Sequence, residues 1–215
     1  MSIRNKYEAE LKEVYDKLVK MLREVEIAID TSMQALETRD KLLAEQTFEK
    51  EKEIDHLERE IEQDCLKILL IEHPVAGDFR EISAALKMIT DLERIGDQAR
   101  DIAEIALQFG DEAYIKKLEH IPMMASIAIS MVKDSVHAYI NRDLQLATCL
   151  DKRDDAVDKM FETVKNELVD LIKLDSANAD QAILLMMIAK YIERIADHAV
   201  NIGEWVEYAI TGNHS

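Results

Sequence analysis

The residues of this sequence that could bind a ligand or take part in a reaction are regularly spaced carboxylates. Two stretches carry acidic or amide side chains at intervals of four residues, and residues four apart lie on one face of an α-helix. The members are Glu93, Asp97 and Asp101 in the first stretch, and Glu193, Asp197 and Asn201 in the second. Their oxygens suit hard or borderline cations such as iron, manganese, magnesium or calcium, and zinc also accepts carboxylates. Each stripe is therefore a candidate for metal binding.

A second pair of acidic stripes precedes the first pair along the chain. Its members are Glu51, Asp55, Glu58 and Glu62 in one half of the chain, and Asp154 and Asp158 in the other. Like charges four residues apart destabilise a helix by about 0.2–0.5 kcal/mol per pair. Such stripes are therefore expected either to have cationic partners or to serve a function. If neighbouring helices bring the two kinds of stripe together, each half of the chain holds a multinuclear metal site on its surface. A solvated acidic face with salt bridges is the alternative.

The second copy of these stripes differs from the first in ways that predict a weaker site. Phe161 stands where Glu58 would map, and Lys165 stands where Glu62 would map. An amide, Asn201, replaces the carboxylate of Asp101. The second site should have fewer ligands and less negative charge, unless Asp151 contributes from the same side of its helix.

An internal repeat predicts that these residues lie on equivalent helices in the two halves of the chain. DLERIGDQARDIAE at 91–104 overlays YIERIADHAVNIGE at 191–204, with seven of the fourteen positions identical. Earlier in each half the offset changes to 103, where Arg39-Asp40 meets Arg142-Asp143. This repetition predicts two tandem copies of one supersecondary structure.

Each repeat is expected to be three long helices. The chain has only 5 Gly and 2 Pro among 215 residues, and 48% of its residues are hydrophobic. Helices are predicted over 41–71 and over 78–108, with Asp78 as the N-cap after a break at His73 and Pro74. The predicted fold is all-α: two tandem three-helix bundles, six long helices in all, with the first bundle over 1–110 and the second over 111–215.

Charge and motifs exclude several classes of function. The formal net charge of −17 argues against nucleic acid as a partner and makes the chain a poor direct receptor for phosphate. The two cysteines lack metal or disulfide spacing. The longest run without charged residues, 120–132, is too short to span a membrane, and no signal-peptide pattern opens the chain, so a cytoplasmic protein is expected. No motif for an organic cofactor, a nucleophile or a ferritin-like di-iron centre occurs.

Three segments resemble the PhoU family of phosphate-signalling regulators: HPVAGDFR at 73–80, DLERIGDQARDIAE at 91–104 and YIERIADHAVNIGEWVEY at 191–208. The resemblance covers essentially the whole chain. It implies a regulator that is not an enzyme, which links a phosphate-specific ABC transporter to a sensor histidine kinase and represses phosphate-starvation genes when phosphate is abundant. Association with the membrane would then be peripheral and only through these partners.

The resemblance also implies iron or zinc clusters on the repeated acidic motifs, with manganese or magnesium as further options and no organic cofactor. The positions that carry over as metal ligands are Glu51, Asp55, Glu93, Asp97, Asp101, Asp154, Asp158, Glu193, Asp197 and Asn201. Two rival interpretations stay open: a metal-dependent enzyme or metal-storage protein, and a structural helical adaptor without metal. A homodimer is also left open, because heptad spacing serves a bundle within one chain equally well.

Overall fold

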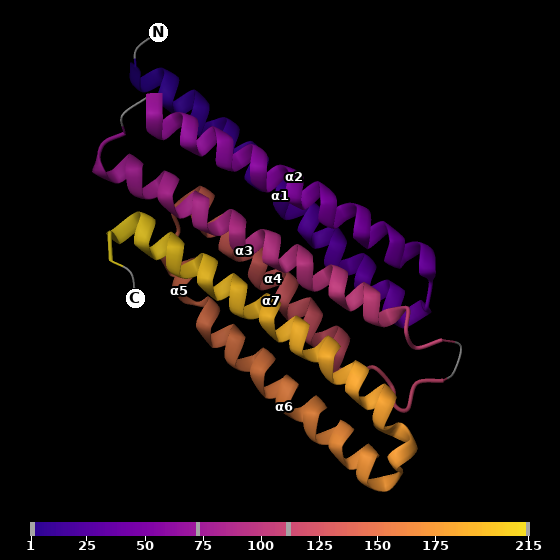
Figure 1. Ribbon diagram of the computed structural model, residues 1–215. Helices are drawn as coiled ribbons and strands as arrows, with labels where there is room; N and C mark the ends of the chain where they lie inside the picture. The colour runs from indigo at the N-terminus through magenta and orange to yellow at the C-terminus, as the bar shows by residue number, and fades with distance from the viewer. Residues whose placement is uncertain (1–2, 72–73, 111–112, 214–215) are drawn as a thin grey trace.

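The computed structural model describes residues 3–71, 74–110 and 113–213, and within these ranges the chain forms helices without any strand (Figure 1). The elements are α1 (Ile3–Thr38), α2 (Lys41–Ile71), α3 (Ala76–Ala106), α4 (His120–Asn141), α5 (Leu144–Thr148), α6 (Leu150–Leu174), a 3₁₀ turn (Ser176–Asn178) and α7 (Ala179–Thr211). No helix in the described ranges combines the length and the apolar composition needed to cross a membrane. The predicted all-α fold is confirmed.

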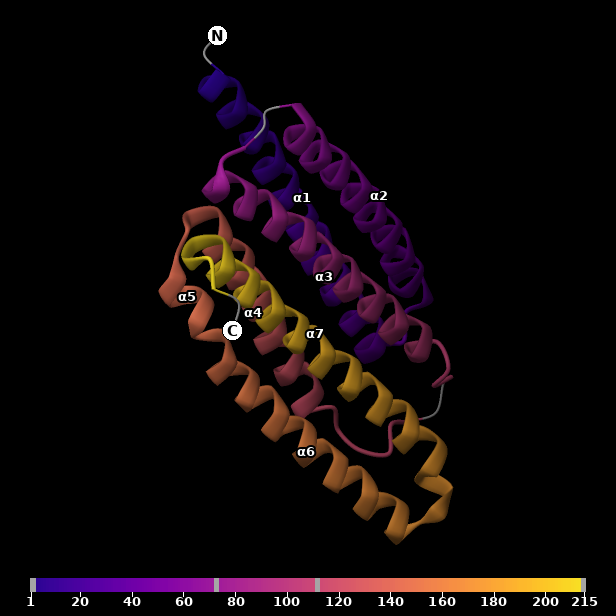
Figure 2. The ribbon, with the colours of Figure 1, turned by 60° about the vertical axis from the view of Figure 1, so that its left-hand side comes forward.

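The helices form two three-helix bundles that pack side by side (Figure 2). The first contains α1, α2 and α3; in the second, α4 and α7 pack with α5 and α6, which together take the place of one helix. The third helices of the two repeats, α3 and α7, run antiparallel along the seam between the bundles (Figure 1). Fully buried Leu92, Ile95, Ile192 and Ile195 belong to one core that is continuous across the two bundles. We keep residues 1–110 and 111–215 as the proposed division between the repeats.

The repeated Arg-Asp pair builds the turn between the first and second helix of each bundle. Arg39 and Arg142 both adopt the left-handed backbone conformation, with φ of 59° and 53°. The carboxylate that follows then caps the next helix: Asp40 accepts a hydrogen bond from the amide of Leu42 at 2.8 Å, and Asp143 accepts one from Leu146 at 3.0 Å. The same two residues therefore end one helix and begin the next in both repeats.

The third helix begins two residues earlier than predicted. Val75, in extended conformation, precedes the first turn, and its carbonyl oxygen accepts a hydrogen bond from the amide of Phe79 at 2.9 Å. The prediction that Asp78 is the N-cap is wrong, because Asp78 lies inside the first turn, where the helix dipole favours a carboxylate. The helix ends at Ala106 rather than at 108. His73 lies outside the described residues.

The second repeat departs from the expected three long helices, because its second helix is interrupted between α5 and α6. Gly203 of α7 packs against this interruption. A Cβ atom on Gly203 would lie 3.0 Å from the carbonyl oxygen of Ala147 and 2.9 Å from Cδ1 of Leu150. The close approach of α7 to the end of α5 thus requires a residue without a side chain.

This contact predicts that replacing a glycine inside a helix by alanine destabilises the protein, although alanine normally favours the helix. Gly203→Ala should lower the free energy of unfolding by about 1–3 kcal/mol, because a side chain there is overpacked against a main-chain oxygen. Gly77→Ala is the matched control: Gly77 lies in the first turn of α3 with nothing within 4 Å of its Cβ position. That substitution should leave stability unchanged or raise it by up to about 1 kcal/mol. Urea denaturation of both variants checks the pair, and a stabilising Gly203→Ala would contradict the packing described here.

Candidate metal centre

The acidic stripes of the first repeat meet where α2 packs against α3. We call this set the first carboxylate cluster: Glu51, Asp55 and Glu58 from α2, with Glu93 and Asp97 from α3. Burial and then the charges of Asp55 and Asp97 raise the pKa of Glu51, although Arg100 opposes this shift. Burial, Asp97, Glu58 and Asp55 likewise raise the pKa of Glu93. Carboxylates of the two helices therefore repel one another.

The second carboxylate cluster lies at the equivalent place, where α6 packs against α7. It consists of Asp151, Asp154 and Asp158 from α6, with Glu193 and Asp197 from α7. Burial, followed by the charges of Asp197, Asp158, Glu193 and Asp151, raises the pKa of Asp154 to about 6. The pKa of Asp197 is raised by burial and then by Glu193. Asp154 thus lies at the centre of this cluster.

One oxygen of Asp154 has no hydrogen-bond partner in this cluster. Asp154 Oδ1 is buried and accepts no hydrogen bond. A buried carboxylate oxygen without a partner is costly, and a cation held by the surrounding carboxylates would satisfy it. The oxygen donors, the negative charge and this unpaired atom together fit a metal ion of the kinds predicted.

Basic side chains now neutralise part of both clusters. Arg100 Nη1 lies 3.6 Å from Glu51 Oε1, and Arg94 Nη1 lies 3.3 Å from Asp97 Oδ2. In the second cluster Lys190 pairs with Glu193. With the side chains in these positions, no three His, Cys, Asp or Glu residues of the described ranges are arranged to hold a metal ion together. Arg94, Arg100 and Lys190 are each about half exposed, so these pairs cost little to break and metal would compete with them.

Asp101 and Asn201 lie one turn beyond the clusters and contact the opposite repeat. Asp101 lies beside the hydroxyl of Tyr191 on α7, which partly opposes the rise that burial causes in the pKa of Asp101. Asn201 Nδ2 donates to Asp91 Oδ1 on α3 at 3.3 Å, and His198 Nδ1 lies 2.8 Å from the same oxygen. The repeat offset of 100 relates Asp91 to Tyr191 and Asp101 to Asn201. The same two positions of the repeat therefore meet twice across the seam. The structure therefore does not place these two predicted ligands with the others.

Glu58 belongs to the first cluster, although the family motif did not include it among the ligands. Burial and then the charges of Asp55 and Glu62 raise its pKa, and Thr90 of α3 partly opposes this rise. In the second repeat, Phe161 and Lys190 stand at the positions of Glu58 and Thr90. The Lys190 ammonium lies 5.5 Å from the centroid of the Phe161 ring. The acidic spacing in α2 was the signal that identified Glu58 as a stripe member, and the contact with α3 places it in the cluster.

The raised pKa of Asp154 predicts how stability depends on pH in the metal-free protein. An unfolded aspartate has a pKa near 3.9, so the folded protein holds its proton more tightly, and this contribution to stability is lost as pH rises from about 4 to about 6. Asp154→Asn should therefore stabilise the chelator-treated protein at pH 7 by about 1 kcal/mol after solvent screening, and have no such effect near pH 4. Denaturation curves at both pH values test this. Destabilisation at pH 7 would show that Asp154 has a favourable partner.

The fold and these clusters define a class of proteins: tandem repeats of a three-helix bundle that present acidic motifs on their second and third helices. The PhoU domain model matches residues 18–106 and, separately, residues 121–206. This chain belongs to the PhoU family, as the resemblance of its motifs predicted.

Individual relatives cover nearly the whole chain. A "phosphate-specific transport system accessory protein PhoU homolog" of Clostridium acetobutylicum is 36% identical over 207 residues, which are 96% of this chain and 94% of that protein. A protein of the same description from Aquifex aeolicus is 37% identical over 86% of this chain and 84% of its own length. The crystal structure of PhoU from Pseudomonas aeruginosa matches with a TM-score of 0.91 at 32% identity, covering 96% of this chain and 100% of that one.

Proposed function

We propose that this protein is an accessory regulator of phosphate-specific transport that acts by binding partners rather than by catalysis. The names of its relatives associate them with a phosphate transport system, and family membership supports the same role here. The clusters lack an apparent nucleophile with its base, which favours regulation over turnover. In this proposal the protein lies in the cytoplasm and passes the state of a phosphate ABC transporter to a sensor histidine kinase.

The proposal assigns metal ions to the two carboxylate clusters. The unpaired Oδ1 of Asp154, surrounded by carboxylates from two helices, is the observation that carries this assignment. Glu51, Asp55, Glu93 and Asp97 would hold iron or zinc in the first repeat, and Asp154, Asp158, Glu193 and Asp197 in the second. Bound metal would supply positive charge to which an anion such as phosphate can bind, although the chain itself carries a net charge of −17.

A complementation experiment in the native host tests the regulatory role. A host strain lacking the gene receives either the wild-type gene or a cluster variant with alanine at Glu93, Asp97, Glu193 and Asp197. Wild type should restore repression of phosphate uptake and of a starvation-gene reporter in high phosphate. The cluster variant should leave both several-fold higher, because the metal state that partners detect is lost.

The control for the cluster variant loses the same number of carboxylates outside the clusters. A variant with alanine at exposed Glu13, Asp16, Glu162 and Asp170 removes two Glu and two Asp from outside the clusters. It should repress as wild type does. If the cluster variant also represses fully while present at wild-type level, the clusters have no role in regulation. If wild type itself has no effect on phosphate uptake, the proposed function is wrong.

A further inference from the structure

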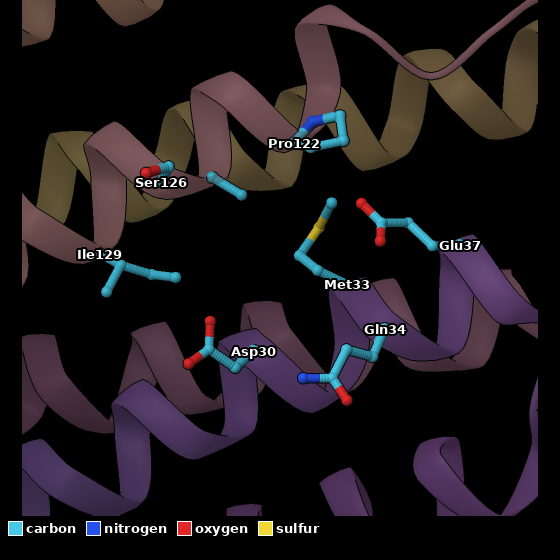
Figure 3. Close-up of a pocket in the computed structure, with 8 residues that line it drawn as sticks. Asp30, Met33, Gln34, Glu37, Pro122, Ser126 and Ile129 are labelled. Carbon is cyan, nitrogen blue, oxygen red and sulfur yellow. The ribbon is translucent and has the colours of Figure 1, made fainter.

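A surface groove between α1 and α4 lies where the first helices of the two repeats meet. Its volume is about 320 Å³, and it is formed by helices that carry neither carboxylate cluster. From α1 it is lined by Asp30, Met33 and Glu37, and from α4 by Ala125, Ser126 and Ile129 (Figure 3). Any ligand of this groove would therefore contact both repeats at once.

The groove combines an apolar floor with an acidic rim. Met33 and Ala125 are buried, at 7% and 3% exposure, and Ile129 is half-buried beside them. Asp30 and Glu37 are exposed at the rim, and both carboxylates turn toward the space between the helices (Figure 3). Partial burial raises the pKa of Asp30. Neither rim carboxylate has a basic partner within the part of the chain that the structure describes.

This combination matches a cation carried on an apolar stem. The two carboxylates are two helical turns apart, about 10 Å along α1, and the buried floor of Met33 and Ala125 is apolar. Arginine lays its methylene stem along apolar surface and presents a planar, weakly hydrated guanidinium to carboxylates. A volume of this size admits one such side chain. We propose that the groove binds an arginine side chain presented by a partner protein, and that this contact holds α1 against α4.

A pair of short blocked peptides tests the proposal with the full-length protein. One peptide, Ac-Ala-Ala-Arg-Ala-Ala-NH₂, carries the cation, and the other replaces arginine by citrulline, which is nearly isosteric but neutral. With ¹³C-labelled methionine and isoleucine methyl groups, the arginine peptide should shift the NMR signals of Met33 and Ile129, and the citrulline peptide should leave them in place. In Asp30→Asn/Glu37→Gln the affinity for the arginine peptide should fall about fivefold or more.

Two controls separate this site from the general negative charge of the chain and from the metal clusters. Glu13→Gln/Asp16→Asn removes two exposed carboxylates from the same helix outside the groove, and should bind the arginine peptide as wild type does. Metal content should be unchanged in Asp30→Asn/Glu37→Gln, so the proposal for the groove and the proposal for the clusters are tested independently. Equal shifts with both peptides, equal loss of affinity in the two variants, or tighter binding of free spermidine at Met33 would overturn the proposal.

Discussion

Saturation with zinc or ferrous iron is expected to raise the thermal midpoint of this protein by about 5–10 °C. A ligand that binds only the folded state at a hundred times its Kd adds about 2.7 kcal/mol, and 1 kcal/mol shifts the midpoint of a chain of this size by about 2–4 °C. The stabilisation should be large because the metal also relieves the repulsion that raises the pKa values of Glu51, Glu93 and Asp154. Calorimetric scans of chelated and reconstituted protein measure this rise.

The cluster variant, with alanine at Glu93, Asp97, Glu193 and Asp197, should lose most of this rise. Its metal-free midpoint should equal or exceed that of wild type, since the lost carboxylates repel one another. The control variant with alanine at Glu13, Asp16, Glu162 and Asp170 should retain the full metal response. A metal-induced rise of the same size in the cluster variant would place the metal elsewhere on the protein.

The largest loss of stability from one polar residue is expected for Glu81→Ala. Glu81 is 7% exposed on α3, where its Oε1 accepts a hydrogen bond from the hydroxyl of Tyr15 at 2.5 Å and pairs with Arg142 Nη1 at 3.0 Å. This carboxylate therefore joins α1 and α3 to the turn that follows α4. Its removal leaves the partly buried hydroxyl of Tyr15 without a partner, so the free energy of unfolding should fall by about 2–3 kcal/mol. Urea denaturation at neutral pH measures this loss.

The repeat offers a matched control for Glu81 at Gln181, the residue at the same position of α7. Gln181 accepts a hydrogen bond from the amide of Ile115 at 3.2 Å and donates one to the carbonyl of Ala113 at 3.3 Å. These neutral bonds are made to the segment between the repeats and are partly exposed, so Gln181→Ala should cost about 1 kcal/mol or less. Losses of equal size in the two variants would show that the charged network has no special role.

Much of the fold could be predicted from the sequence because local patterns determine it. The four-residue spacing and the scarcity of Gly and Pro predicted long helices, and the overlay of 91–104 on 191–204 predicted two copies of one bundle. The interruption between α5 and α6 could not be predicted in this way. It lies against Gly203, a residue far along the chain that approaches Ala147 only when α7 packs.

The candidate site shows the same limit. A helical wheel predicted which carboxylates share a face of α3 or α7, but it gives no information about the neighbouring helix. Asp97 faces α2 in the folded protein, whereas Asp101, one turn further on, contacts Tyr191 of the other repeat. The repeated motif is thus continuous in sequence, while some of its side chains face the second helix of their own repeat and others face the seam between repeats.

Metal content per chain is the most direct test of the central claim that the two carboxylate clusters bind metal. Elemental analysis by mass spectrometry would compare wild type with the cluster variant, each chelated and then reconstituted with iron or zinc and freed of excess metal. Wild type should retain at least one equivalent for each cluster, and the variant should retain almost none while its helical circular dichroism is unchanged. Wild type without metal above background, or a variant that retains as much metal as wild type, would contradict the claim.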